Sequence, residues 1–248
     1  MNQALHKILY RLLPLKLYLR AVSAMLFLLL RLGWGRKKEA VEYIYHLGNL
    51  VRSGDVVIDI GANLGYYTRT FSRIVGSEGH VYAVEPVPPI FEVLNANTRK
   101  CRNVTLMNVA LGEENTTITM ANDTVASQGY FGTGQNFVQE VHSDEAVEFA
   151  AIMQRGSELF MSLQQLDLIK CDIEGYEGVV LREMLPIIER FRPIILLESG
   201  GETREEMIQL FTQMNYRGFT LKNGEEVELR DSSCKDIIFR PLDPKPCE

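Results

Sequence analysis

Residues 55–65 have the sequence Asp-Val-Val-Ile-Asp-Ile-Gly-Ala-Asn-Leu-Gly, and this stretch decides the fold. Its first part, residues 55–60, is a short run rich in β-branched residues, which is typical of a buried parallel strand. The glycines that follow allow a tight turn. Residues 66–75 then have the composition of a helix that ends before a glycine. The stretch therefore predicts a strand–turn–helix unit of an α/β domain.

Strands and helices alternate on both sides of an irregular middle segment. We expect strands at 80–85, 104–108, 166–171 and 193–198, helices at 39–51, 88–100, 176–191 and 202–214, and a closing strand pair at 219–222 and 236–240. This alternation predicts a mostly parallel sheet with helices on both faces. The middle segment, 112–165, contains two further candidate strands, 116–120 and 147–153. The long polar, glycine-rich stretch between them is typical of a functional or mobile loop.

Charge divides the chain into two parts. Residues 1–38 contain eight basic residues and no acidic one, whereas residues 39–248 contain 18 basic and 32 acidic residues, a net charge of −14. This asymmetry indicates that the two parts face different surroundings, so we expect a helical extension followed by one domain. The acidic domain argues against a nucleic-acid partner, because a phosphate backbone requires a basic surface.

The basic N-terminal segment has three interpretations. Its longest uncharged run, Ala21–Leu30, is shorter than the roughly 20 apolar residues that span a bilayer. We expect Pro14 to kink or restart a helix. The segment is a basic amphipathic helix on an anionic membrane surface, a helix packed against the domain, or an uncleaved signal anchor. The charges that interrupt it favour contact with the surface over a span, so we expect a cytoplasmic protein with peripheral membrane contact through residues 1–38.

The four cysteines do not predict a metal site. They are Cys101, Cys171, Cys234 and Cys247, and they form no Cys-x-x-Cys pair. Without such a pair or a histidine cluster, structural zinc is not expected. Reduced thiols on the cytoplasmic side of a membrane are the simpler interpretation.

Polar residues and glycines follow the first two strands, at the edge where an open parallel sheet binds its ligands. Asp59, Gly61, Asn63 and Gly65 lie at the end of the first strand and in its turn. Their spacing differs from the Gly-x-Gly-x-x-Gly turn that seats a pyrophosphate. A ligand without phosphate, such as the sulfonium nucleoside S-adenosylmethionine (SAM), is one interpretation of this turn, and a tight turn without a ligand is the alternative. Glu85 ends the second strand, about 20 positions on, where an acid can accept both ribose hydroxyls.

The third and fourth strands also end in candidate site residues. Asn108, followed by Ala110, is placed to recognise the edge of adenine, although an asparagine that caps the strand is the alternative. Asp172, Glu174 and Glu177 lie within six residues after the fourth strand. Carboxylates grouped at the mouth of a sheet suit a general base, and acids at a helix N-terminus are the alternative. We expect Asp172 and Glu174 to face the pocket and Glu177 to cap the helix.

Together these segments resemble the FkbM family of SAM-dependent methyltransferases. The resemblance spans about residues 50–200, and its most specific part is the pattern Lys-x-Asp-x-Glu-Gly-x-Glu at 170–177. It implies a seven-stranded class I sheet, SAM as the cofactor, and O-methylation of a sugar, glycolipid or small secondary metabolite. Carried over by position, it implies that SAM is held by Asp59, Gly61, Asn63, Gly65 and Glu85. It places Asp172 at the methyl-transfer site.

In such a reaction a base removes the proton of the acceptor hydroxyl. Our first candidate is Asp172, followed by Glu174 and then His142 from the irregular segment. A divalent cation held by Asp172 and Glu198 is an alternative. A membrane-surface scaffold on a degenerate methyltransferase fold is a rival function. An NAD-dependent dehydrogenase is a third, weakened by the missing third glycine. The sequence leaves the acceptor and the oligomeric state open.

Overall fold

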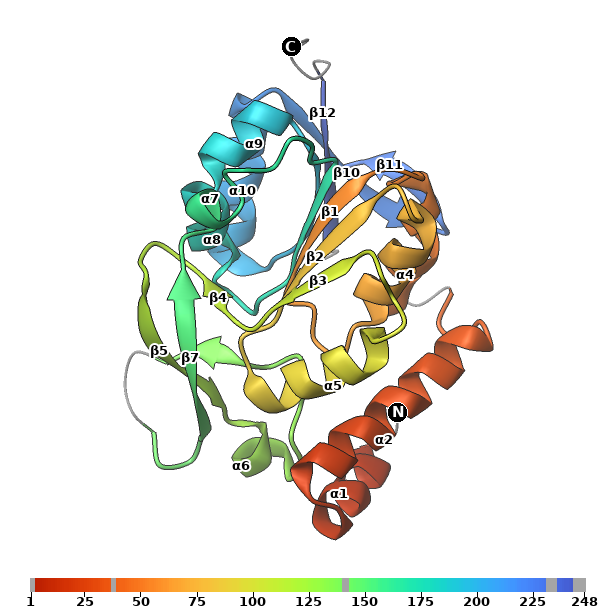
Figure 1. Ribbon diagram of the computed structural model, residues 1–248, viewed down its shortest axis with the longest axis vertical. Helices are drawn as coiled ribbons and strands as arrows, with labels where there is room; N and C mark the ends of the chain where they lie inside the picture. Colours follow the sequence, from red (N-terminus) through yellow and green to blue (C-terminus); the bar gives the residue numbers. More distant parts are fainter. Residues whose placement is uncertain (1–2, 37–38, 140–142, 231–235, 243–248) are drawn as a thin grey trace.

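The structure is a computed structural model that describes residues 3–36, 39–139, 143–230 and 236–242 (Figure 1). Its centre is an eight-stranded sheet with the order β11-β10-β12-β9-β8-β1-β2-β3. The strands of this sheet are β1 (Val56–Ile60), β2 (His80–Val84), β3 (Val104–Met107), β8 (Leu168–Cys171), β9 (Ile194–Glu198), β10 (Tyr216–Lys222), β11 (Glu225–Glu228) and β12 (Asp236–Pro241). The predicted α/β class is confirmed.

The sheet is mixed and has one strand more than expected. Its strands from β9 to β3 are parallel, whereas β12, β10 and β11 pair antiparallel at the other edge. The predicted closing pair corresponds to β10 and β12. The additional strand is β11, which follows a turn at Asn223 and Gly224 with left-handed backbone angles. Because most of β11 is exposed, no apolar pattern marks it in the sequence.

Helices cover both faces of the main sheet (Figure 1). On one face lie α3 (Glu39–His46), the 3-10 helix η1 (Leu47–Asn49), α4 (Tyr66–Val75) and α5 (Pro88–Thr98). On the other lie α7 (Gly156–Leu159), α8 (Glu177–Glu183), α9 (Leu185–Phe191) and α10 (Gly201–Gln213). Because both faces are covered, β8 is buried along its whole length. The helix expected at 176–191 is observed as the pair α8 and α9, with Pro186 in the first turn of α9.

The middle segment forms a second sheet of four strands in the order β4-β7-β5-β6. Its elements are β4 (Ala110–Leu111), β5 (Thr116–Asn122), α6 (Thr124–Gln128), β6 (Phe137–Val138) and β7 (Val147–Gln154). β5 and β7 pair antiparallel along the whole of β5, so both strands predicted here are confirmed. Residues 129–136, between α6 and β6, return to the turn after β1. We call residues 129–136 the covering loop.

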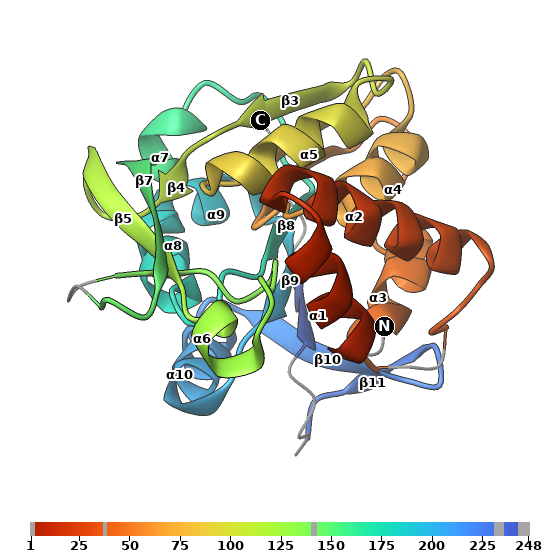
Figure 2. The same ribbon diagram turned by 90° about the horizontal axis from the view of Figure 1, so that it is seen from below.

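The N-terminal segment forms two helices, α1 (Gln3–Leu12) and α2 (Leu15–Arg31); α2 lies beside α5, and α1 packs against α2 (Figure 2). They are separated at Pro14, as expected. Tyr18 and Leu19 are fully buried in a cluster that includes Ile90 of α5. Of the three interpretations of this segment, the structure agrees with the second, a helix packed against the domain. None of the described helices is both long and apolar enough to cross a bilayer. Contact with a membrane surface stays a prediction.

Candidate functional site

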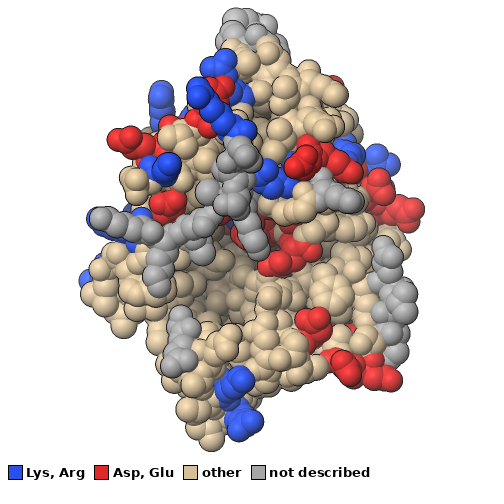
Figure 3. All heavy atoms as spheres, turned by 180° about the vertical axis from the view of Figure 1, so that it is seen from behind, with Lys and Arg blue, Asp and Glu red and all other residues tan. Residues whose placement is uncertain are grey.

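A pocket of about 180 Å³ lies at the carboxyl ends of β1, β2, β8 and β9. It brings together six of the predicted site residues and the alternative metal ligand Glu198; the six are Gly61, Asn63, Glu85, Ala110, Asp172 and Glu174. Their convergence from separate strands is what the parallel topology predicts. On the face seen in Figure 3, acidic side chains gather beside a hollow near the centre of the molecule. We call this cavity the strand-tip pocket.

The glycine turn after β1 is fixed by contacts within the protein. Gly61 has a φ of +75°, and a Cβ added there would lie 1.9 Å from the carbonyl oxygen of Asp172. Gly65 has a φ of +86°, and its added Cβ would lie 2.7 Å from the side chain of Leu94 in α5. We expected the glycines to admit a ligand. The structure shows that these two glycines leave room for the backbone that follows β8 and for the side of α5.

Asp59 lies beneath the pocket. It is fully buried and accepts a hydrogen bond of 2.6 Å from the Thr68 hydroxyl of α4. Its other oxygen lies 3.8 Å from Nζ of Lys170. Among the described residues, Asp59 and Gly65 are not part of the pocket wall. Their predicted role toward SAM would therefore be indirect, through the shape of the turn.

Lys170 is a site residue to which we assigned no role from the sequence. Its buried ammonium donates to the carbonyl oxygen of Gly61 at 3.1 Å and to Oδ2 of Asp172 at 3.0 Å. Burial alone would lower the pKa of Lys170, but the nearby carboxylates of Asp172 and Asp59 outweigh it and raise the pKa above its usual range. Lys170 thus ties the glycine turn to Asp172. Alternation along β8 is the missed signal, because residues two apart share one side of a strand.

Glu85 is held at the end of β2 by two backbone N–H groups. Asn63 donates to its Oε2 and Val87 to its Oε1, each at 3.0 Å. Burial raises the pKa of Glu85 to about 7, against the opposing effect of these hydrogen bonds. Each carboxylate oxygen has a second lone pair, so Glu85 can still accept hydroxyl groups from a ligand.

Asn108 and Ala110 differ in their relation to the pocket. Nδ2 of Asn108 donates to the backbone oxygens of Glu85 at 2.8 Å and of Pro86 at 3.1 Å. This contact shapes the turn after β2, as the capping alternative predicted. Among the described residues, Asn108 is outside the pocket wall whereas Ala110 is in it.

The segment after β8 carries the predicted catalytic carboxylates. Asp172 and Glu174 line the pocket, and Glu174 has a left-handed φ of 56°. Glu177 accepts the N–H groups of Ile173 and Gly175 at 3.1 and 3.0 Å, so it caps this turn. His142 lies outside the described residues. Within the described part of the chain, no group of three or more His, Cys, Asp or Glu residues is arranged to hold a metal ion.

The covering loop closes one side of the pocket. The Asn63 amide donates to the carbonyl oxygen of Thr133 at 3.2 Å. From α2, the buried Tyr18 hydroxyl donates to the carbonyl oxygen of Phe131 at 2.9 Å. The N-terminal helices therefore help to hold this loop, whose residues in the pocket wall are Thr133, Gly134 and Asn136.

Comparison with known proteins identifies this arrangement. Residues 59–218 match the model of the methyltransferase FkbM domain. The chain belongs to the FkbM methyltransferase family. A crystal structure of the methyltransferase FkbM from Methylobacillus flagellatus has a TM-score of 0.51 and 16% identity, covering 77% of this chain but 45% of that one. This likeness shows a shared fold, and the matched part is less than half of that protein's length.

Two curated relatives of this FkbM-family chain are protein-L-isoaspartate O-methyltransferases. The enzyme from Ignicoccus hospitalis is 26% identical over 168 residues, which cover 62% of this chain and 69% of that enzyme. The enzyme from Methanothrix thermoacetophila is 31% identical over 75 residues, which cover 29% and 36% of the two chains. The predicted family is confirmed by the match of residues 59–218. The names of these two relatives give protein L-isoaspartate as the group that they methylate.

Membership of the FkbM family implies SAM as the cofactor, and the strand-tip pocket fits it. The buried Oδ1 of Asn63 has no hydrogen-bond partner among the described residues. It is an acceptor available to the ammonium group of SAM. Glu85 suits the ribose hydroxyls, and the apolar residues Val109, Leu111 and Met120 suit the face of adenine.

Proposed function

We propose that this chain transfers the methyl group of SAM to a hydroxyl oxygen of a sugar, glycolipid or small secondary metabolite. The observation that carries the proposal is the acidic wall of the strand-tip pocket, in which Glu85, Asp172, Glu174 and Glu198 converge. We expect the reaction in the cytoplasm, where thiols such as that of the buried Cys171 stay reduced.

The charge of the pocket favours a neutral acceptor. A carboxylate or a phosphate backbone would meet the acidic side chains of Asp172, Glu174 and Glu198, and the partly charged Glu85, against one buried ammonium, that of Lys170. Like charges a few ångströms apart repel strongly in a partly buried site. A hydroxyl group avoids this repulsion, and it requires the base that such a site offers.

Asp172 is the residue that we propose as this base. It is partly exposed to the pocket, and Lys170 holds its Oδ2 at 3.0 Å. Its Oδ1 can then receive the hydroxyl proton while the acceptor oxygen bonds to the methyl carbon. When bound, SAM supplies the methyl group and retains the electron pair of the broken carbon–sulfur bond. Holding the two reactants in line supplies much of the acceleration. Glu174 and His142 are the further candidates, and a cation between Asp172 and Glu198 is the alternative.

The relatives support a second candidate acceptor, a protein carboxyl group. The two acceptors differ in the bond that forms, because a hydroxyl yields an ether and a carboxyl yields an ester. We would incubate the full chain with SAM carrying a tritiated methyl group and with cell extract, and then treat the product with mild alkali. We expect label that resists alkali. Label released as methanol would assign the carboxyl acceptor instead.

An Asp172→Asn variant tests the base. We expect turnover to fall about 10²- to 10⁴-fold, the usual contribution of a general base, while calorimetry shows SAM binding retained. Full turnover in this variant would exclude Asp172 as the base. If the unmodified chain binds no SAM, the rival scaffold function replaces the enzymatic one.

A further inference from the structure

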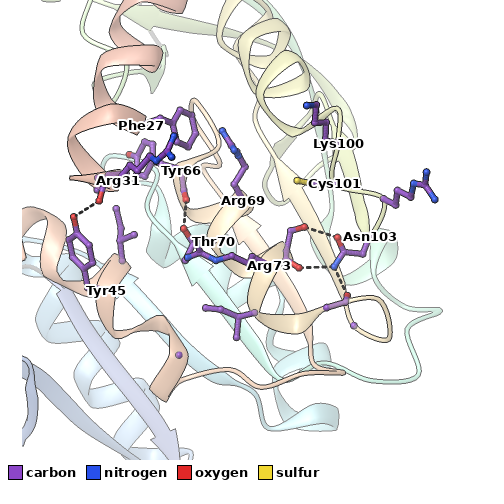
Figure 4. Close-up of a pocket in the computed structure, with 18 of the residues that line it drawn as sticks. Phe27, Arg31, Tyr45, Tyr66, Arg69, Thr70, Arg73, Lys100, Cys101 and Asn103 are labelled. Atoms are coloured by element: carbon purple, nitrogen blue, oxygen red, sulfur yellow. Dashed lines mark hydrogen bonds between the residues drawn. The ribbon is translucent and has the colours of Figure 1, made fainter. Parts of the chain in front are cut away.

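A second and larger hollow, of about 1280 Å³, lies away from the strand tips (Figure 4). It is bounded by α2, α3, α4 and the turn between α5 and β3. Tyr66, at the start of α4, contributes to the walls of this hollow and of the strand-tip pocket. The residues that α2 contributes to this hollow belong to the segment 1–38, for which we predicted membrane contact, whereas the basic residues of α4 and of the turn before β3 had no predicted role. We call it the cationic groove.

The groove concentrates positive charge on an otherwise acidic domain. Its wall includes five exposed basic side chains and no Asp or Glu; the five are Arg31, Arg69, Arg73, Lys100 and Arg102. None of them forms an ion pair with a carboxylate of the described residues. Cations gathered without counter-charges repel one another, and a multivalent anion between them removes that repulsion.

One side of the groove is apolar. Phe27 and Leu30 of α2 and Ile44 of α3 line it. The guanidinium group of Arg69 lies over the ring of Phe27, 4.5 Å from its centre, and Figure 4 labels both side chains. The Tyr45 hydroxyl donates to the Leu30 carbonyl oxygen at 3.1 Å and so joins α3 to α2. The groove thus offers a charged side and an apolar side in one cavity.

The turn between α5 and β3, which carries two of the cations, is also held in place. Asn103 accepts a hydrogen bond of 2.6 Å from the Ser72 hydroxyl, and its amide donates to the carbonyl oxygens of Ser72 and Gly76 at 3.0 and 2.6 Å. These bonds join the turn to the end of α4. Lys100 and Arg102 are therefore carried by a backbone that is fixed relative to Arg73.

We propose that the cationic groove binds an amphiphile that carries a phosphate group. Arg69, Arg73 and Lys100 would surround the phosphate, because guanidinium forks match its oxygens and several cations suit a group with more than one negative charge. The hydrocarbon part would lie along Phe27 and Leu30. Two further leucines of the same region, Leu28 and Leu32, are 55% and 72% exposed, which suits contact with the chains of a lipid.

The proposal is tested by calorimetry on the full chain at low salt with three probes. Dihexanoyl phosphatidic acid carries both parts of the ligand, pyrophosphate carries only the anionic part, and dihexanoyl phosphatidylcholine has tails but no net charge. We expect the phosphatidic acid to bind at least tenfold more tightly than either of the other two. If pyrophosphate or phosphatidylcholine binds as tightly as phosphatidic acid, the proposal of an amphiphilic ligand is wrong. It is also wrong if none of the three probes binds.

Variants assign the binding to the groove. Arg73→Ala combined with Lys100→Ala should weaken the binding of phosphatidic acid at least tenfold. SAM binding should stay unchanged, which would show that the fold of the double variant is intact. Arg190→Ala, on α9 at the opposite face of the sheet, is the matched control and should bind as the unmodified chain does. Unchanged binding in the double variant would overturn the proposal.

Chemical modification of Cys101 provides a test that is independent of calorimetry. Cys101 lies in the groove wall and is partly exposed. Bound phosphatidic acid should slow its alkylation by iodoacetamide several-fold, as followed by peptide mapping. Alkylation at the same rate with and without saturating probe would place the ligand elsewhere and reject the groove.

Discussion

The strand-tip pocket and the cationic groove have opposite charges, and they hold those charges differently. Two acids of the pocket, Glu85 and Asp172, stand at strand ends, where backbone N–H groups and Lys170 hold them before any ligand binds. The basic residues of the groove are exposed side chains on helices and a turn, without acidic partners among the described residues. The pocket is therefore preorganised for a fixed geometry of reaction, whereas the groove is suited to attract and retain an anion.

The largest expected difference between the two regions is the effect of losing one cation. Lys170→Met should lower the free energy of unfolding by about 3–5 kcal/mol, because it leaves the buried Asp59 and the partly exposed Asp172 without their ammonium. Arg73→Ala should leave it unchanged within experimental error, since Arg73 is exposed and unpaired among the described residues. Urea denaturation at neutral pH compares the two variants. Equal losses would show that Lys170 does not hold the acidic pocket together.

The second expected difference is the response to pH. Burial raises the pKa of Glu85 to about 7, so this carboxyl group becomes protonated below neutrality in the folded chain. A protonated carboxyl accepts ribose hydroxyls poorly, so SAM affinity should fall as the pH drops below 7, by up to about tenfold per pH unit. Binding at pH 7 should also release protons, because SAM favours the charged form. The basic residues of the groove stay charged over this range, so a pH dependence of phosphate binding there would come from the second ionisation of the phosphate, at about pH 6, and Glu85→Gln should leave it unchanged.

Calorimetry between pH 6 and 8, in two buffers of different ionisation enthalpy, measures both effects. Glu85→Gln should remove the pH dependence and lower the affinity at pH 8. The same raised pKa predicts that the contribution of Glu85 to folding is largest at low pH and declines as the pH rises from about 4.5 to 7. A SAM affinity that stays flat across neutral pH would contradict the proposed role of Glu85.

The two regions also differ in how far the sequence predicts them. The pocket could be predicted because a parallel sheet brings the ends of its strands to one edge, so Glu85 and Asp172 had to lie close together. We did not predict a role for Lys170, because we considered only the residues that follow each strand. Lys170 precedes Asp172 by two residues and therefore lies on the same face of the strand. The groove could not be predicted, since it depends on where α2 docks. The period of an amphipathic helix shows that one face is buried, but not against which element.

The smallest expected effect tests whether the N-terminal helices also serve the pocket. Tyr18→Phe keeps the buried ring but leaves the Phe131 carbonyl oxygen of the covering loop without its donor. A lost hydrogen bond of this kind costs about 1 kcal/mol, so SAM should bind about fivefold more weakly, and amide exchange in residues 129–136 should become faster. Tyr10→Phe is the matched control, because its ring packs against Tyr18 but no described residue pairs with its hydroxyl. Equal SAM affinities for both variants would show that the N-terminal helices do not influence SAM binding through the covering loop. The remaining role of these helices would then be in the groove.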